Sequence, residues 1–476
     1  MIDKHVKLGL LCTRRNVDGD FFCNVEIAGR NRDAIKQKLT EMGIDFVAID
    51  DIVADGMIRL GSDAKKVADY FIDQKVDAVF APHCNFGTED AVAKVGKLVG
   101  KPLLLWAPRD PAPDPAHDFG RATDAQCGVM ATGKVLRDFG VPFSYMSNCW
   151  LEDECFERSL HRFMNVAAVV KSLTHLRIGL VSNRPAEFWS VKYNEQQLLE
   201  KFGIEVETVT LIELQQRYRK ILETQREFLI DTVTEYRENC EIQVDEESLY
   251  RTAALKKAML EWVREKDLSA VASTCWGPMR DMAGIASCFV FGELTGEGIP
   301  TVCEGDVNGA VTAVIAAAAT GWEKDPFFAD ITQRHPTNDN AELFWHCGVF
   351  TRKTATRACK PCIKGNFDEN RPTVGGFRIE DGDVTILRFD STMDQYSMLI
   401  AEGKTVDGPK TNGTYGWIEF KDWLEIEHKV VCGPYIHHVA GVHAHIADVL
   451  YEACKYIHVQ PDLCDPNETE VQKRLR

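Results

Sequence analysis

The sequence has no long hydrophobic run and no surplus of positive charge. Its most apolar stretch, around Ala310–Ala319, is far shorter than the ~20 residues that a membrane-spanning helix needs. The 55 basic and 72 acidic residues among 476 give a formal net charge of −17, so the surface as a whole repels nucleic acids and anionic membranes. We therefore expect neither as a partner, although a local basic pocket for a small anion is still allowed.

The cysteines form no disulfide framework. Sixteen of them are scattered along the chain, and several, such as Cys84 and Cys303, lie in apolar runs where a free thiol behaves as a small hydrophobe. Cys359 and Cys362 make a lone Cys-x-x-Cys pair without the further ligands of a zinc site, which indicates two free thiols in a loop. The N-terminus shows no signal peptide, so we expect a cytoplasmic protein.

Strand and helix patterns alternate in the first third of the chain. Short apolar runs predict buried strands at 6–12, 46–49, 78–82 and 102–107. Helical spacing separates them at 32–42, 63–74 and 90–98. This alternation indicates a parallel sheet with helices on both faces. It restarts with apolar runs at 176–181, 206–211, 270–274 and 300–303.

After about His335 the runs become short, alternating and punctuated by glycine, which indicates antiparallel strands. The fold predicted from these patterns is α/β, with two Rossmann-like parallel-sheet domains followed by a smaller antiparallel, barrel-like β domain that ends in a helix. The expected domain limits are 1–174, 175–335 and 336–476. A charged, amphipathic stretch at 214–265, broken near 239–245, lacks sustained heptads and predicts a solvated helical hairpin.

Ligands of open parallel sheets bind beyond the carboxyl ends of the strands, so the residues there are the first candidates for a site. They are rich in carboxylates, arginines and aromatics, and they include Arg14, Trp276, Glu304 and Asp306. Trp106 lies at the end of the fourth predicted strand. The sequence contains no Gly-x-Gly-x-x-Gly motif and no Walker loop, which argues against dinucleotide binding and ATP binding.

Glu304 and Asp306 end an apolar strand where a helix is about to begin. Two carboxylates in that place are costly without a cation or a helix N-terminus to balance them, so both a metal site and an N-cap pair are open. Asp330, taken alone, is interpreted as a turn residue.

Four of the thirteen histidines fall within residues 435–445, which predicts that one of them is a metal ligand. Alternation along an extended chain places His437 and His438 on opposite sides, so only one is expected to face a given site. His346 is either a buried structural histidine or a pocket donor. A mixed Glu, Asp and His site without thiolate suits Mn²⁺, with Co²⁺, Fe²⁺, Mg²⁺ and Zn²⁺ as alternatives.

Several motifs occur in order along nearly the whole chain. They are Arg14–Gly19, Thr274–Trp276, Leu294–Thr301, Cys303–Ala310, Phe344–Gly348 and His437–His443. As a set they resemble the L-fucose isomerase family and its arabinose isomerase relatives. The resemblance implies two α/β domains and a C-terminal β domain, in agreement with the patterns above.

The same resemblance implies a site. Family members hold a divalent metal, usually Mn²⁺, with a Glu, an Asp and a His, which correspond here to Glu304, Asp330 and His438. The two carboxylates also serve as the expected catalytic groups. Arg14 matches the family's substrate-binding arginine, which in family hexamers reaches a neighbouring subunit's site, so a homo-oligomer is expected. We add four candidates for binding the sugar: Trp106, Trp276, His346 and His437.

The expected function is metal-dependent aldose–ketose isomerisation of a monosaccharide through a cis-enediolate. The sugar is left open among fucose-like, arabinose-like, other deoxy, phosphorylated and sulfonated forms. Two alternatives stay open as well: a metal-dependent lyase or epimerase that shares the enediolate step, and a non-catalytic sugar-binding protein whose two α/β domains close on the ligand.

Overall fold

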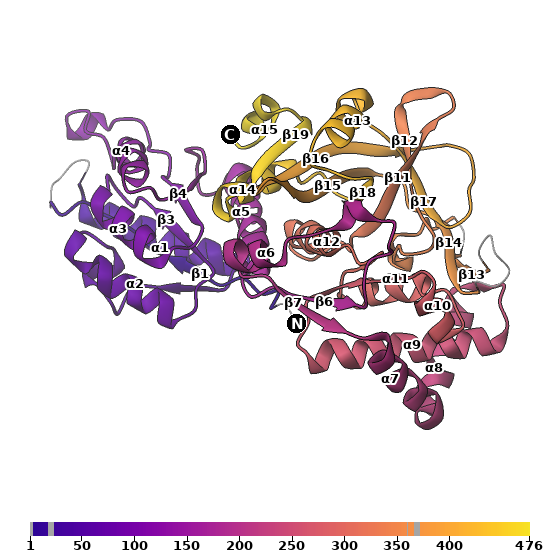
Figure 1. The fold of residues 1–476 in the computed structure, drawn as a ribbon. Helices are drawn as coiled ribbons and strands as arrows, with labels where there is room; N and C mark the ends of the chain where they lie inside the picture. The colour runs from indigo at the N-terminus through magenta and orange to yellow at the C-terminus, as the bar shows by residue number, and fades with distance from the viewer. Residues whose placement is uncertain (1–2, 18–22, 359, 366–371) are drawn as a thin grey trace. The chain divides into compact units, whose positions relative to one another are not determined.

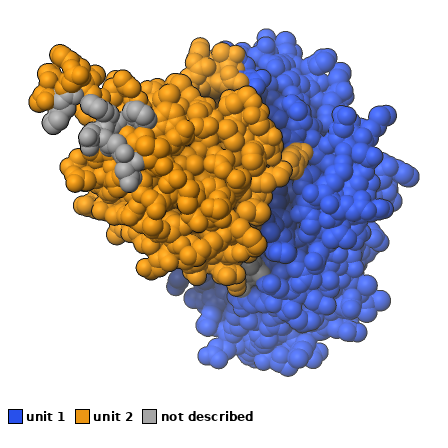
Figure 2. Space-filling model, turned by 90° about the vertical axis from the view of Figure 1, so that its left-hand side faces the viewer, with its two compact units in different colours: residues 1–4, 172–450, 459–468 blue, residues 5–171, 451–458, 469–476 orange. Residues whose placement is uncertain are grey.

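The computed structural model describes residues 3–17, 23–358, 360–365 and 372–476 (Figure 1). The chain divides into two compact units, shown in different colours in Figure 2. The N-terminal unit comprises residues 5–171, 451–458 and 469–476, and the C-terminal unit comprises residues 1–4, 172–450 and 459–468. Within the described ranges, every helix is too short or too polar to cross a membrane.

The N-terminal unit is built on a parallel sheet with the strand order β2-β1-β3-β4-β5. These strands are β1 (Leu8–Leu10), β2 (Phe46–Ala48), β3 (Ala78–Pro82), β4 (Leu103–Trp106) and β5 (Ser144–Tyr145). Its helices are α1 (Val25–Glu41), α2 (Ala64–Asp73), α3 (Glu89–Val99), α4 (Ala125–Asp138) and α5 (Glu154–Leu173). Successive residues of β3 belong to different hydrophobic clusters, Phe80 to one and Val79 to the other. The sheet is therefore covered on both faces, as its continuous apolar runs predict.

The C-terminal unit begins with a second parallel sheet, in the order β10-β9-β6-β7. Its strands are β6 (Arg177–Val181), β7 (Glu205–Val209), β9 (Ala270–Ser273) and β10 (Thr301–Cys303). The helices of this region are α6 (Glu195–Phe202), α7 (Leu211–Thr224), α8 (Arg226–Asn239), α9 (Glu246–Glu265), α10 (Pro278–Ala283), α11 (Cys288–Gly296) and α12 (Val307–Ala319). Every residue of α12 is buried, because this helix packs against β9 of the sheet and against β15 and β18 of the barrel described next.

Six antiparallel strands of the same unit close into a barrel. They are β11 (Phe327–His335), β12 (Asn338–His346), β15 (Asp383–Thr392), β16 (Gln395–Val406), β17 (Thr414–Glu419) and β18 (His438–Val442). Neighbours pair in the order β16-β15-β18-β11-β12-β17, and β17 pairs with β16 to close the ring. The predicted fold class is thereby confirmed. Asp330 lies inside β11, so its interpretation as a turn residue is wrong.

Smaller elements complete the two units. The strands β8 (Glu241–Ile242), β13 (Cys362–Lys364) and β14 (Val374–Arg378) extend the sheet beyond β17, and β19 (Gln460–Asp465) pairs with β16. The remaining helices are α13 (Trp423–Cys432), α14 (Ala447–Ile457) and α15 (Glu468–Arg474). The helix predicted to end the β domain corresponds to α14, and α15 follows it.

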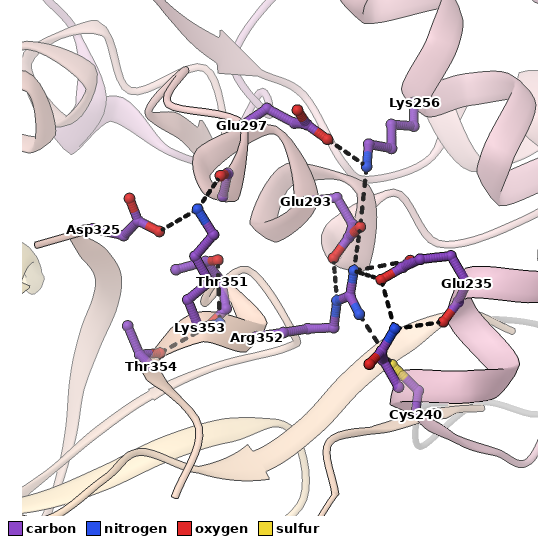
Figure 3. A network of polar contacts seen from close by, with 12 residues as sticks. Glu235, Cys240, Lys256, Glu293, Glu297, Asp325, Thr351, Arg352, Lys353 and Thr354 are labelled. Atoms are coloured by element: carbon purple, nitrogen blue, oxygen red, sulfur yellow. Dashed lines mark hydrogen bonds and ion pairs between the residues drawn. The ribbon is translucent and has the colours of Figure 1, made fainter. Parts of the chain in front are cut away.

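The charged stretch at 214–265 forms α7, α8 and α9, with a break at β8 where the sequence predicts one. A network of ion pairs centred on the buried Glu293 ties it to α11 (Figure 3). Arg352 donates from Nε to Glu293 at 2.6 Å and from Nη2 to Glu235 of α8 at 2.9 Å. Lys256 of α9 lies 3.2 Å from Glu293 and 2.9 Å from Glu297. The prediction of a solvated hairpin is therefore wrong for α9, whose inner face is buried.

A buried carboxyl on β12 makes the stability of the C-terminal unit depend on pH. Burial raises the pKa of Glu342 to about 7, although Arg334 partly opposes the shift. Its proton is kept by the folded chain but lost by the unfolded chain between about pH 4.5 and 7, so stability should fall as pH rises through this range, by at most roughly 3 kcal/mol. The Glu342→Gln variant stays neutral. Its Tm should match that of the wild type near pH 5 and exceed it by a few degrees near pH 8; equal melting curves at both pH values would contradict this prediction.

Candidate active site

The turn between β10 and α12 places the first carboxylate. Glu304 and Gly305 both have left-handed backbone conformations, with φ of 65° and 67°. A glutamate in this region is strained by about 1–3 kcal/mol, and such strain is concentrated at functional sites. A Cβ on Gly305 would lie 3.1 Å from the backbone of Arg184, so the close approach also requires glycine. Asp306 then caps α12 by accepting from the Gly309 N–H at 2.8 Å.

Three side chains that are distant in the sequence meet at this turn. His438 is the first residue of β18, and Asp330 is its direct partner on β11. His438 Nε2 lies 3.0 Å from Glu304 Oε2 and 3.4 Å from Asp330 Oδ1. His438 is fully buried and Glu304 is 5% exposed. The structure therefore brings together the three residues that the sequence predicts as metal ligands.

Apart from the 3.0 Å ion pair between His438 and Glu304, the facing atoms of these residues lack hydrogen-bond partners among the described residues. Glu304 Oε2, Asp330 Oδ1 and His438 Nε2 are all buried, and so is a fourth unpartnered atom, His346 Nε2. A buried polar atom without a partner costs about 1–3 kcal/mol, so native proteins rarely keep several in one place. Two carboxylate oxygens and one imidazole nitrogen are donors suited to a divalent cation, so the residues present fit such an ion.

Asp306 orients His438 through the ring nitrogen that faces away from Glu304 and Asp330. Its Nδ1 lies 2.9 Å from Asp306 Oδ2, and because a carboxylate only accepts, Nδ1–H is the donor. This bond directs Nε2 towards Glu304 and Asp330, as in histidines that ligate metals. Burial lowers the pKa of His438, but Asp306, Glu304 and Asp330 outweigh burial and raise it to about 9.

Arg388 compensates the buried Asp306. Its Nη1 lies 2.5 Å from Asp306 Oδ2, and its Nη2 lies 2.7 Å from Asp390 Oδ2. Arg388 is 1% exposed and Asp306 is fully buried. Burial raises the pKa of Asp306, but Arg388 and His438 outweigh burial and hold that pKa well below its usual range. Of this pair of carboxylates, Asp306 takes the N-cap position of α12, and Glu304 faces His438 instead.

The two neighbouring histidines also face Asp330. His346 Nδ1 accepts from the Cys347 N–H at 2.9 Å, which leaves Nε2 directed at Asp330 Oδ1, 3.9 Å away. Ligand atoms of Asp330, His437 and His438 lie within 4.8 Å of one another. The expectation that only one of His437 and His438 faces the site is therefore wrong. The alternation does not apply, because His437 precedes the start of β18.

Aromatic rings line the site next to the histidines. Trp276 is 41% exposed and packs edge-on against Phe188, with ring centroids 5.0 Å apart. Phe188 in turn faces His437 at 6.1 Å, and Phe328 faces His438 at 5.2 Å. Trp276 is thus placed beside the site, as the sugar-binding prediction requires. Phe188 was missed because it lies seven residues beyond the end of β6, outside the residues that directly follow a strand.

Arg14 and Trp106, two further sugar-binding candidates, belong to the N-terminal unit. Arg14 is 2% exposed and donates to Asp55 at 2.7 Å. Trp106 is fully buried and packs edge-on against Phe156, so the structure gives it a packing role. The sugar contacts of both residues, and the reach of Arg14 into a neighbouring subunit of a hexamer, stay predictions. Residues 18–19 of the Arg14 motif and position 359 of the Cys-x-x-Cys pair lie outside the described residues.

Two family models match the chain. The N-terminal domain of fucose/sulfoquinovose isomerases matches residues 9–174, and the C-terminal domain of L-fucose isomerase matches residues 346–463. Relatives named sulfoquinovose isomerase include one from Priestia aryabhattai, 25% identical over 70% of this chain and 73% of that protein. Another, from Alkalicoccus urumqiensis, is 27% identical over 79% of this chain and 83% of that protein.

Among solved structures, a periplasmic solute-binding protein from Actinobacillus succinogenes 130z with bound D-allose aligns over 63% of this chain and 85% of its own. The TM-score is 0.17 and the identity is 11%, which is too low to carry an argument about fold or function. The family models and the named relatives, by contrast, make the chain a sugar isomerase that interconverts an aldose and a ketose. It belongs to the L-fucose isomerase family, which confirms the resemblance seen in its motifs.

Proposed function

We propose that this isomerase works with one divalent cation, Mn²⁺ in the first instance, held by Glu304, Asp330 and His438. Co²⁺, Fe²⁺, Mg²⁺ and Zn²⁺ are the alternatives. The proposal is carried by one observation, the convergence of three buried ligand atoms from β11, β18 and the turn after β10, which face one another at 3.0 and 3.4 Å around His438 Nε2. When bound, the cation would supply Lewis-acid stabilisation of the negative charge that develops on the sugar's O1 and O2.

The side chains supply the proton transfers of a reaction through a cis-enediolate. In the proposed reaction, one carboxylate, Glu304 or Asp330, removes the proton from C2 of the aldose and returns it to C1, while a second proton moves from the O2 hydroxyl to O1. Asp306 and Arg388 keep His438 oriented throughout, because they hold its Nδ1 side. Trp276 and Phe188 offer aromatic faces to the apolar side of the sugar.

We further propose a 6-sulfonated aldose as the substrate. The relatives are named sulfoquinovose isomerases, and a cavity of about 410 Å³ beside the Glu304 turn carries the cationic groups that a sulfonate requires. Gly305 lines this cavity together with Arg184 and Lys192. Fucose-like and arabinose-like neutral sugars are the alternatives. They carry no anionic group that two cationic side chains in this cavity would bind.

The experiment is a screen of aldoses and ketoses, including 6-deoxy, 6-phospho and 6-sulfo forms, with added Mn²⁺ and with a chelator. We expect conversion of the sulfonated aldose to its ketose, loss of conversion with the chelator, and, in D2O, solvent deuterium at C1 of the ketose. Cleavage of the carbon chain would indicate a lyase, an aldose product epimeric at C2 would indicate an epimerase, and tight binding without conversion would indicate a sugar-binding protein.

Arg184 provides a test of the sulfonate assignment. The Arg184→Met variant should raise KM for the sulfonated sugar by roughly 10–100-fold, because a hydrogen bond to a charged group contributes about 1.5–3 kcal/mol. The matched control is Arg177→Met, at the opposite end of β6, which should leave KM unchanged. Steady-state kinetics with sulfonated and neutral aldoses decide the matter: an equal rise in KM for both sugars would contradict the assignment.

A further inference from the structure

We propose that Cys275, Cys288, Cys303 and Cys347 form a second metal site, a thiolate site for a soft divalent cation, Zn²⁺ in the first instance. We call these residues the four-cysteine cluster. The inference is independent of the proposed sugar and of the carboxylate–histidine site, because it rests on a different set of ligand atoms.

The sulfur atoms converge from four separate segments. Cys275 follows β9, Cys288 begins α11, Cys303 ends β10 and Cys347 follows β12. The Sγ atoms of the first three lie within 4.8 Å of one another. Cys347 Sγ lies 3.1 Å from Cys288 Sγ, and its thiol also interacts with that of Cys303. In a tetrahedral zinc site with Zn–S bonds of about 2.3 Å, neighbouring sulfurs are about 3.8 Å apart, so the cluster needs only small shifts to hold an ion.

The surroundings of the cluster suit a structural metal site. Cys303 is fully buried, and Cys275 and Cys288 are 7% and 4% exposed, so the ion would be shielded from water. Cys347 is only partly buried, so a metal ion can reach the cluster from solvent on this side. Cys288 is the first residue of the nine-residue helix α11, so a regular element holds its sulfur in place. By contrast, Cys12 and Cys84 bring together only two thiols.

The cluster is connected to both sides of the isomerase site. Cys303 directly precedes Glu304, and Cys347 directly follows His346. The Cys347 thiol also lies 3.4 Å from His346 Nδ1. An ion in the cluster would therefore fix the strained Glu304 turn and the orientation of His346 without touching the sugar. Each ligating thiol gives its proton to solvent on binding, so four protons leave for one ion. Thiolates prefer softer ions than carboxylates do, which keeps the two metal sites distinct.

The test uses the full chain, purified under reducing conditions with zinc present. We expect one zinc ion per chain that stays bound in the His438→Gln variant and is released when a mercurial reagent blocks the thiols. Replacement by Co²⁺ should give the near-ultraviolet sulfur-to-cobalt charge-transfer band. Cys288→Ala and Cys347→Ala should each abolish that band. Two matched variants should keep it: Cys454→Ala, which removes an isolated buried cysteine, and His438→Gln, which damages only the carboxylate–histidine site.

Three results would overturn the proposal. The first is a wild-type protein that binds no zinc and shows no charge-transfer band, which decides the question even if the cysteine variants fail to fold. The second is a band that survives in both cysteine variants. The third is a Cys288–Cys347 disulfide that persists under the reducing, zinc-containing conditions, because the thiols would then serve as a redox pair. Loss of turnover in His438→Gln with the charge-transfer band intact would show that the four-cysteine cluster binds its ion independently of the carboxylate–histidine site.

Discussion

The Glu304→Gln variant is expected to fold normally and to lose roughly 10²–10⁴-fold in kcat, the range in which a positioned acid–base group contributes. Glutamine has nearly the same shape as glutamate, so the turn after β10 is kept. It carries no charge to face a cation and accepts no proton from a sugar carbon. The loss should appear with saturating Mn²⁺ and saturating sugar, in steady-state kinetics at constant pH.

Glu342→Gln is the matched control for this variant. It makes the same chemical change at a carboxyl on β12 that is 6% exposed, and it should leave kcat within about two-fold of wild type, because it makes none of the contacts described at the site. Near-normal turnover of Glu304→Gln in metal-replete assays would remove Glu304 from the mechanism, whatever the control does.

The Arg388→Met variant is expected to lose about 3–5 kcal/mol of stability, the cost of leaving buried charge without its partner. Methionine fills similar space, but Asp306 and Asp390 are then left in the core without their shared guanidinium. His438 also loses the fixed carboxylate that orients it. Thermal unfolding at one scan rate should show a lower Tm, and turnover should fall as well.

Arg378→Met controls for the loss of an arginine from the same unit. Arg378 pairs with the exposed carboxylates Asp381 and Asp407, and surface pairs of this kind contribute about 0–1 kcal/mol. Its Tm should therefore stay close to that of wild type. Equal destabilisation by both substitutions would show that the buried triad of Asp306, Arg388 and Asp390 contributes no more to stability than a surface ion pair does.

The local sequence pattern was sufficient to predict a strand where that strand is short, apolar and buried on both faces. β3 spans Ala78–Pro82 as predicted, since its apolar run is bounded by charged and polar residues. The stretch before α9 breaks where predicted because Asp245 caps the helix by accepting from the Ser248 N–H. The burial of α9 was not predictable, because charged residues such as Lys256 are buried there by partners on α11 that are distant in the sequence.

At the site, too, some features were predictable from the local sequence and others depend on residues that are distant along the chain. Cys-Glu-Gly-Asp was recognisable as a turn needing a compensating charge, and the family resemblance indicated Asp330 and His438. Arg388 was missed, although an arginine within the apolar run 386–389 is a signal that a buried carboxylate lies opposite. That Asp330 sits opposite His438 depends on the pairing of β11 with β18, a register between strands more than 100 residues apart that no local pattern encodes.

The shared metal site is tested most directly by a Mn²⁺ binding titration followed by electron paramagnetic resonance, on the wild type and on Glu304→Gln, Asp330→Asn and His438→Gln. We expect one tightly bound ion in the wild type and at least a tenfold weaker one in each variant. Undiminished Mn²⁺ binding by all three folded variants would show that these side chains do not share a cation, and it would contradict the proposed metal site.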